Sequence, residues 1–360
     1  MEHKIHIAYY DFWKGIAILM VVAIHTGWGF DFVSMEGNLR IVLRSVMNSA
    51  VPIFLAISGY FLSKQMLDNR EKVLAFWKKQ ISKVYIPMLF WSIPYILIGV
   101  LLHKENLLKS FILMICGGYS IYYFIPLIIQ CYVLLPFIQK YKTFSFYGSV
   151  VLCIFSWLFI SYVLPPLPLI VYAGSFMPWI YFFVLGIIMA NRGKKNLVFF
   201  SIMLLIVGIA LQYLESLYLF SLGHISWGQK ATSIVSNTGI ILFLFSDRVR
   251  TCYNSNKMNR IIEFLGIHSF GIYLVHCYFI FLLSFFNKIN SWSIKCFIVI
   301  SLTSLFVVII RYIIPLLSGE ILPQRKLSRT VTLRNISSEV GLIKYIFDVA
   351  SFEEDLTNRV

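Results

Sequence analysis

Charged residues are scarce in this sequence. The segment 143–191 contains no Asp, Glu, Lys or Arg, and its polar side chains are all neutral. Asp, Glu, Lys and Arg make up 13% of the 360 residues, whereas hydrophobic residues make up 59%. A soluble protein of this length needs far more polar surface to cover its core. The composition therefore excludes an ordinary soluble protein and predicts a multi-pass membrane protein.

Several motifs that carry well-known chemistry are also missing. The chain has no phosphate-binding loop of the Walker type and no Gly-x-Gly-x-x-Gly fingerprint, which argues against an ATP-driven pump or a dinucleotide enzyme. None of the six cysteines forms a Cys-x-x-Cys pair, and the histidines lack ligand spacing. We therefore expect neither a disulfide framework nor a metal site. The apolar run 12–30 has no small-residue cleavage site after it, so we interpret it as a membrane helix rather than a signal peptide.

The net charge of +15 is not accompanied by a basic–aromatic module, so we expect no nucleic-acid partner. Basic residues instead gather in alternate loops of the predicted bundle. These basic clusters lie within 64–83, 140–142, 192–195 and 248–260. Cytoplasmic loops are enriched in Lys and Arg, which places these loops, and with an even number of spans both termini, in the cytoplasm.

A spanning helix needs about 20 apolar residues, and the apolar runs predict about ten such helices. They lie near 12–30, 40–63, 84–102, 121–139, 145–164, 176–191, 197–214, 230–246, 264–286 and 295–318. The fold class expected is an all-α membrane bundle over 1–319 with a cytoplasmic tail over 320–360. The short apolar segment 107–118 is expected to be re-entrant or to lie at the outer interface.

Two ionisable residues in the first predicted helix share one face. Lys14 and His25 are eleven positions apart, which at 100° per residue leaves them about 20° apart around the axis and about 16 Å apart along it. This arrangement suits a long ligand with an anionic end at Lys14 and a reactive end at His25. Taken separately, Lys14 is compatible with an interfacial lysine and His25 with a hydrogen-bonded packing residue.

The string Asp11–Ile16 followed by His25 resembles the opening motif of the acyltransferase 3 family of membrane proteins, in which a basic residue, ten others and a His follow one another. Further matches follow in the family's order over roughly 8–318: Val51–Phe54 with Ile57–Tyr60, Lys79 and Lys83 before Tyr85–Pro87, Tyr122–Phe124 with Leu135 and Pro136, and Phe270–His276. Two departures are Lys14, where the family usually has Arg, and Gln80, where it often has Arg.

The resemblance implies transfer of an acyl group, most often acetyl, from cytoplasmic acyl-CoA to a sugar hydroxyl. The acceptor implied is a cell-surface polysaccharide or its lipid-linked precursor, and the location implied is a bacterial cell membrane. Among members of the family, the sequence is similar to small ones that modify enterobacterial common antigen or poly-N-acetylglucosamine. The acceptor sugar and the oligomeric state are not readable from the sequence.

The catalytic candidates are His25, Asn48 and His276. Histidine suits a general base near neutral pH, and a covalent acyl-histidine is the variant of that mechanism. Asn48 lies at about the depth of His25 and is a candidate for orienting the imidazole or stabilising the oxyanion, although helix packing explains it equally well. His276 is a candidate second polar partner, with a structural hydrogen bond as the alternative.

The binding candidates lie toward the two membrane faces. Lys14, Lys79 and Lys83 are expected to hold the phosphates of CoA at the cytoplasmic side. Arg40 and Arg44 are one turn apart and are candidates for contacting an anionic or hydroxyl-rich glycan, with an interfacial ion-pair cluster as the alternative. Tyr122 is a further candidate contact for the acceptor.

Two other functions compete with acyl transfer. A polysaccharide or lipid-linked sugar transporter is compatible with many helices and aromatic side chains, but inverted repeats with paired broken helices are not detected. A membrane scaffold without chemistry is disfavoured by the polar residues inside the predicted helices.

Overall fold

A computed structural model describes residues 2–27, 34–117, 121–162, 173–192, 195–223, 228–285 and 291–314. All regular structure within these ranges is α-helical, which confirms the all-α prediction. The predicted tail, 320–360, lies outside the described residues. Helix bounds are α1 Glu2–His25, α2 Met35–Met47, α3 Ala50–Leu62, α4 Arg70–His103, α5 Leu107–Ile115, α6 Phe124–Lys140, α7 Lys142–Tyr162, α9 Ile180–Asn191, α10 Val198–Ser221, α11 Ser233–Leu244, α12 Asp247–Thr251, α13 Lys257–Ile267, α14 Ser269–Ser284 and α15 Trp292–Ile313.

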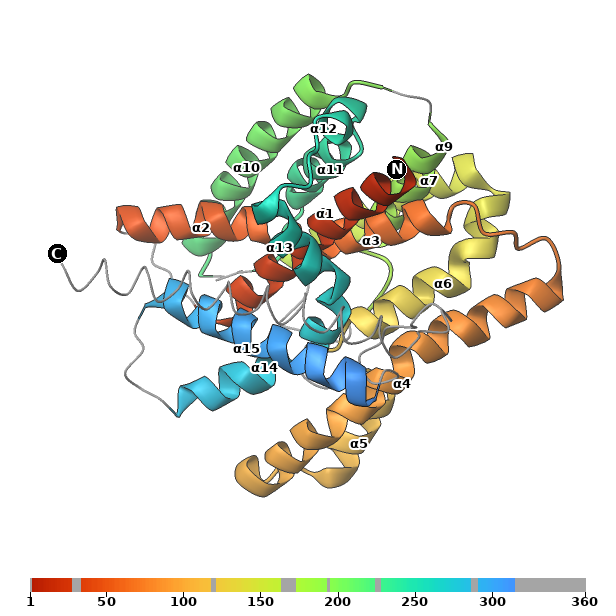
Figure 1. The fold of residues 1–360 in the computed structure, drawn as a ribbon. Coiled ribbons are helices and arrows are strands. Elements are labelled where there is room, and N and C mark those ends of the chain that lie inside the picture. The colour runs from red at the N-terminus through yellow and green to blue at the C-terminus, as the bar shows by residue number, and fades with distance from the viewer. Residues whose placement is uncertain are drawn as a thin grey trace.

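The helices form a bundle around α1, which crosses its middle (Figure 1). Helices α10 and α11 pair on one side of α1, and α14 and α15 run side by side on another (Figure 1). Helices α7 and α10 expose large apolar side chains such as Phe155 and Ile206, which is the surface expected of a helix that faces lipid. These two helices therefore present an apolar exterior.

Within the described ranges, five segments are long and apolar enough to cross a membrane, and the bent pair α13–α14 would make a sixth. Helices α6, α9 and α11 are apolar but shorter. The multi-pass membrane prediction is thus supported. The number of about ten spans and the cytoplasmic position of both termini stay predictions.

The span expected over 40–63 is present as one apolar segment, Met35–Leu62, which is interrupted at Asn48 and Ser49 between α2 and α3, and a proline explains the interruption. Pro52 has no backbone N–H, so the carbonyl of Asn48 receives no helical hydrogen bond from that residue. The side-chain amide of Gln229 donates to this carbonyl instead. Asn48 consequently ends α2, and Ser49 precedes α3.

The basic segment expected as a loop between the second and third helices is mostly helical, which corrects that prediction. Helix α4 begins at Arg70 because the side chain of Asn69 accepts a hydrogen bond from the backbone of Lys72. Glu71 adds a negative charge in the first turn, where the helix dipole favours it. The predicted third helix thus extends by about four turns toward its N-terminus.

Glycines permit the closest helix contacts. A Cβ atom built on Gly266 of α13 would lie 1.7 Å from the carbonyl oxygen of Asp11, and one on Gly186 of α9 would lie 2.0 Å from that of Ala56. Small residues at such positions let backbones approach in membrane bundles, where lipid offers helices no hydrophobic drive to associate. These contacts fix α1 against α13 and α3 against α9.

The loop before α11 is held by a buried carboxylate. Glu215 of α10 accepts hydrogen bonds from the backbone of Ala231 at 3.2 Å and of Thr232 at 2.9 Å, from the Thr232 hydroxyl, and from Tyr162 Oη at 3.0 Å. The adjacent Lys230, in the loop itself, is 3% exposed. Burial lowers the pKa of Lys230 from 10.5 to about 8; the Glu215 charge opposes this shift, and the Arg44 charge adds to it.

We expect Gly186→Ala to destabilise the protein by about 1–3 kcal/mol, because the added methyl group must push α9 away from α3. The midpoint of thermal unfolding in detergent measures this effect. Gly148→Ala is the matched control, since a Cβ at Gly148 in α7 would meet nothing within 4 Å. Equal midpoints for the two variants would contradict the close packing of α3 and α9.

Lys230→Met should stabilise the folded protein by a pH-dependent amount, because it removes the cost of burying a charged ammonium group. Between pH 8 and 10.5 the unfolded chain holds a proton on Lys230 that the folded chain has lost, so the stability of the wild type rises with pH across this window. The slope from this group is at most about 1.4 kcal/mol per pH unit. The advantage of Lys230→Met in thermal midpoint should therefore shrink from pH 7.5 to 9.5, roughly as this linkage predicts. An advantage independent of pH, like that expected for Met at the exposed Lys78, would contradict the assignment.

Candidate functional site

A cavity of about 690 Å³ lies inside the bundle and is lined by residues of α1, α2, α3, α4, α6 and α14. Lys14 and His25 both line it, so the face they share on α1 borders one continuous space. Their separation of eleven residues on an unbroken helix gives the cavity a length of at least about 16 Å along α1. Apolar and aromatic side chains, including Val21, Phe54 and Phe124, form part of its wall.

The Lys14 end of the cavity is basic. Lys14 forms an ion pair with Asp11 at 2.6 Å, one helical turn away, and Lys83 of α4 contributes a second ammonium group to the lining. Gln80, one turn before Lys83, lines the cavity as well. Two cations and one carboxylate make this end attractive to an anionic ligand.

The His25 end holds a pair of histidines. His25 is partly exposed to the cavity, and the ring of His276 lies behind it with centroids 5.3 Å apart. Nδ1 of the fully buried His276 lies 2.8 Å from the carbonyl of Tyr273 and 3.1 Å from that of Ile272. A carbonyl only accepts, so Nδ1 carries the proton and Nε2 of the neutral ring keeps a lone pair. Among the described residues, Nε2 has no hydrogen-bond partner.

A polar network borders His25 on the side of α2. Arg44 donates from Nη1 to the carbonyl of Ile24 at 3.0 Å and from Nε to Oδ1 of Asn48 at 3.2 Å. The Asn48 amide donates to the carbonyl of Gly228 at 3.1 Å. Gln229, which donates to the Asn48 carbonyl, accepts in turn from the amide of Asn237 at 3.0 Å. The broken α2–α3 helix and the loop before α11 are therefore joined beside His25.

The structure brings five of the predicted site residues to one cavity and leaves four outside its lining. Those that line it are Lys14, His25, Arg44, Asn48 and Lys83. His276 lies behind His25. Lys79 is exposed on α4. Tyr122 is fully buried, and its hydroxyl donates to the carbonyl of Leu274 at 2.7 Å.

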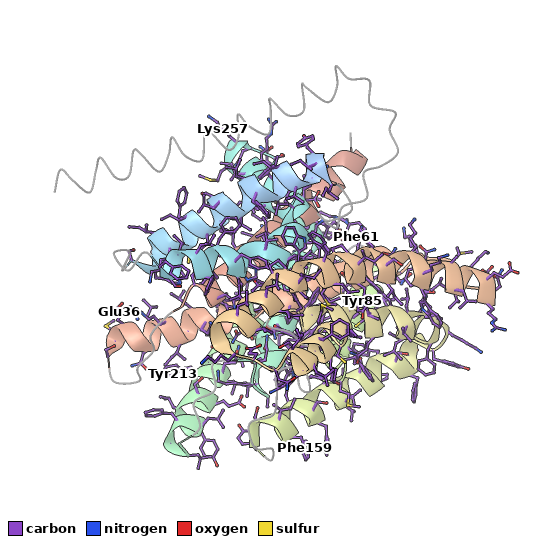
Figure 2. All side chains as sticks on the ribbon, turned by 90° about the horizontal axis from the view of Figure 1, so that it is seen from below. Glu36, Phe61, Tyr85, Phe159, Tyr213 and Lys257 are labelled. Atoms are coloured by element: carbon purple, nitrogen blue, oxygen red, sulfur yellow. The ribbon has the colours of Figure 1, made fainter. Side chains whose placement is uncertain are left out.

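Arg40 is the fourth residue outside the lining. It forms an ion pair with Glu36, which is 72% exposed and lies at the periphery of the molecule (Figure 2). Tyr213 of α10 lies at the same edge (Figure 2), and its hydroxyl donates to the Asn38 side chain at 3.2 Å. The alternative of an ion-pair cluster therefore describes Arg40, which pairs with Glu36, whereas Arg44 lines the cavity.

Sequence reasoning missed residues that distant parts of the chain bring to the cavity. Gln229 reaches Asn48 from 181 positions away. Trp157 and Trp179 line the wall with their rings edge to face at 5.2 Å. Nε1 of Trp157 donates to the Pro178 carbonyl at 2.9 Å, whereas Nε1 of Trp179 has no partner among the described residues. Neither the loop that contains Gln229 nor the tryptophan pair carries a sequence motif that would have identified it.

Comparison with known proteins adds independent findings. A stretch of 102 residues, 28% of this chain, is 38% identical to an amino-acid racemase of Enterococcus faecalis. That match spans only 14% of the racemase's own length. No solved structure matches.

The sequence model of the acyltransferase 3 family, described as an acyltransferase domain, matches residues 7–314. This range contains every helix from the cavity-lining part of α1 to the end of α15. The chain belongs to the acyltransferase 3 family of membrane acyltransferases.

Proposed function

We propose that the protein transfers an acyl group, acetyl in the simplest case, from cytoplasmic acyl-CoA to a hydroxyl of a cell-surface polysaccharide or its lipid-linked precursor. The observation that carries this proposal is the single cavity that joins the basic Lys14 and Lys83 end to His25. The CoA phosphates would bind at the basic end, and the extended arm would carry the thioester along the apolar wall to His25.

His25 would act as general base. Its imidazole removes the proton from the sugar hydroxyl while the hydroxyl oxygen attacks the thioester carbon. The carbon–sulfur bond breaks, the thiolate of CoA leaves, and the proton on His25 passes to that thiolate. The products are the O-acylated sugar and free CoA, and His25 returns to its neutral form.

His276 would act through His25 rather than on the substrate. Because its Nδ1 proton is held by two backbone carbonyls, Nε2 is an acceptor for an N–H of the neighbouring imidazole. Such a hydrogen bond would fix the tautomer of His25 with the unprotonated nitrogen available to the substrate. Asn48 has a supporting role, since its amide is engaged by Arg44 and Gly228.

The tryptophan pair closes one wall of the cavity. Trp157 and Trp179 are 4% and 3% exposed and pack edge to face on each other, so they shape the space for the acceptor rather than offer it a stacking surface. The short likeness to an amino-acid racemase supports no racemisation here, because it spans 14% of that protein.

His25→Ala should lower acyl transfer by at least about 100-fold, the usual minimum contribution of a general base. The assay follows labelled acetyl-CoA into glycan in membrane vesicles with the cytoplasmic face outward. Binding of acetyl-CoA to the purified variant should persist, which separates lost chemistry from lost folding. Equal labelling by variant and wild type would remove His25 from the mechanism. Glycan movement without labelling from any acyl-CoA would favour the transporter instead.

Lys83→Ala should raise the KM for acetyl-CoA about tenfold and change kcat little, since a charged hydrogen bond to phosphate is worth about 1.5–3 kcal/mol. Lys78→Ala is the matched control, because Lys78 lies on the same helix and is exposed outside the cavity. A similar KM for both variants would show that the phosphates bind elsewhere.

A further inference from the structure

Arg44 is a cation whose visible partners are both neutral. It donates to a backbone carbonyl and to the side-chain oxygen of Asn48. A guanidinium group has five N–H donors, so these two bonds leave donors for another ligand. Since Arg44 lines the cavity, those donors are accessible from it.

The carboxylates near this end of the cavity are already engaged. Glu215 accepts four hydrogen bonds, which fills the acceptor sites of its two oxygens. Glu36 pairs with Arg40 outside the cavity. In the described part of the chain, no carboxylate lies within ion-pair distance of Arg44.

The charge that acts on Arg44 from the loop before α11 is also positive. Lys230 is buried near enough to Arg44 for the two charges to repel, and Glu215 is the counter-charge of Lys230 rather than of Arg44. Asp11, the one carboxylate of the described lining, is bound to Lys14 about 16 Å away from the His25 end. A desolvated cation without a counter-charge is costly in an apolar bundle, and an anionic ligand would remove that cost.

The position of Arg44 places such an anion next to the reacting centre. Its guanidinium is bonded to the carbonyl of Ile24, the residue before His25. The phosphates of CoA cannot fill this site while they occupy the basic Lys14 end, because the two ends are about 16 Å apart. The anion must therefore belong to the part of a substrate that approaches His25.

We propose that Arg44 binds a carboxylate of the substrate that reacts at His25. The proposal rests on the acyl transfer proposed above and names its substrate class. The carboxylate has two sources: a dicarboxylic acyl group such as succinyl on the donor, or an acidic sugar such as a uronic acid as the acceptor. Arg recognises carboxylates with two parallel N–H bonds, a geometry that Lys does not reproduce.

Binding of two donors that differ only in the acyl group tests the first source. Dissociation constants of acetyl-CoA and succinyl-CoA are measured for the full-length protein in nanodiscs. If the donor carries the carboxylate, the wild type should bind succinyl-CoA at least about tenfold more tightly, and Arg44→Gln should reduce the ratio to near one. Arg44→Lys, which keeps the charge if the Gln variant fails to fold, should retain only part of the preference. Arg40→Gln, one turn away on the same helix, should retain it fully.

Acceptor binding tests the second source. With acetyl-CoA present, glucuronate is compared with glucose for binding to the wild type, Arg44→Gln and Arg40→Gln. A preference for glucuronate that only Arg44→Gln abolishes supports an acidic acceptor. The absence of any carboxylate preference in both experiments overturns the proposal. If Arg44→Gln lowers turnover equally with acetyl-CoA and succinyl-CoA and changes neither the donor preference nor the acceptor preference, the proposal is also overturned. Arg44 would then stabilise the oxyanion instead.

The same measurements separate this proposal from the proposed function. Loss of acetyl-CoA affinity in Lys83→Ala reports on the CoA site and does not involve Arg44. A protein that binds no acyl-CoA would contradict acyl transfer. Even then, a preference for glucuronate that Arg44→Gln abolishes would still identify Arg44 as part of a carboxylate-binding site.

Discussion

The missing hydrogen bond at Pro52 is the constraint on which the site depends. A backbone carbonyl left unpaired in an apolar bundle costs several kcal/mol, so the Asn48 carbonyl needs a donor from elsewhere in the fold. Gln229 supplies it and thereby ties the loop before α11 to the end of α2. The side chain of the same residue, Asn48, accepts a hydrogen bond from Arg44, whose other bond reaches the backbone beside His25. One proline thus couples three helices at the reacting end of the cavity.

Close helix contacts complete this arrangement from the other side. Gly266 and Gly15 let α13 and α1 approach until a methyl group has no room between them, so α1 is held along the stretch that carries Lys14. The axes of α13 and α14, which follow each other directly, are bent by 81°, and α14 carries His276 to a position behind His25. The close backbone contacts therefore hold the two helices that bring the histidine rings to a centroid distance of 5.3 Å.

The parts of the site that one helix carries were predictable, and the parts that the fold assembles were not. Helical periodicity was enough to place Lys14 and His25 on one face, because both lie on an unbroken helix. The apolar run of 24 residues, 40–63, predicted the single span Met35–Leu62, but hydropathy does not register the local interruption that Pro52 causes at Asn48. Gln229 and Trp179 carry no periodic or motif signal, since their role exists only when distant segments meet. The start of α4 was placed too late because it was set from the apolar run that begins at residue 84, whereas the helix begins after the capping residue Asn69.

The lining of the cavity combines charged and apolar groups. Lys14, Lys83 and Arg44 attract anionic groups, whereas Val21, Phe54 and Phe124 offer none of the polar contacts that water needs. In the proposed reaction, an apolar wall would shield the thioester from hydrolysis until it reaches His25. A ligand that is anionic at both ends and apolar between them would match both the basic and the apolar groups, whereas a ligand anionic at one end only would leave Arg44 without a counter-charge from the described residues. If the proposed function holds, the separation of Lys14 from the His25 end along α1 would select for substrate length as well as for charge.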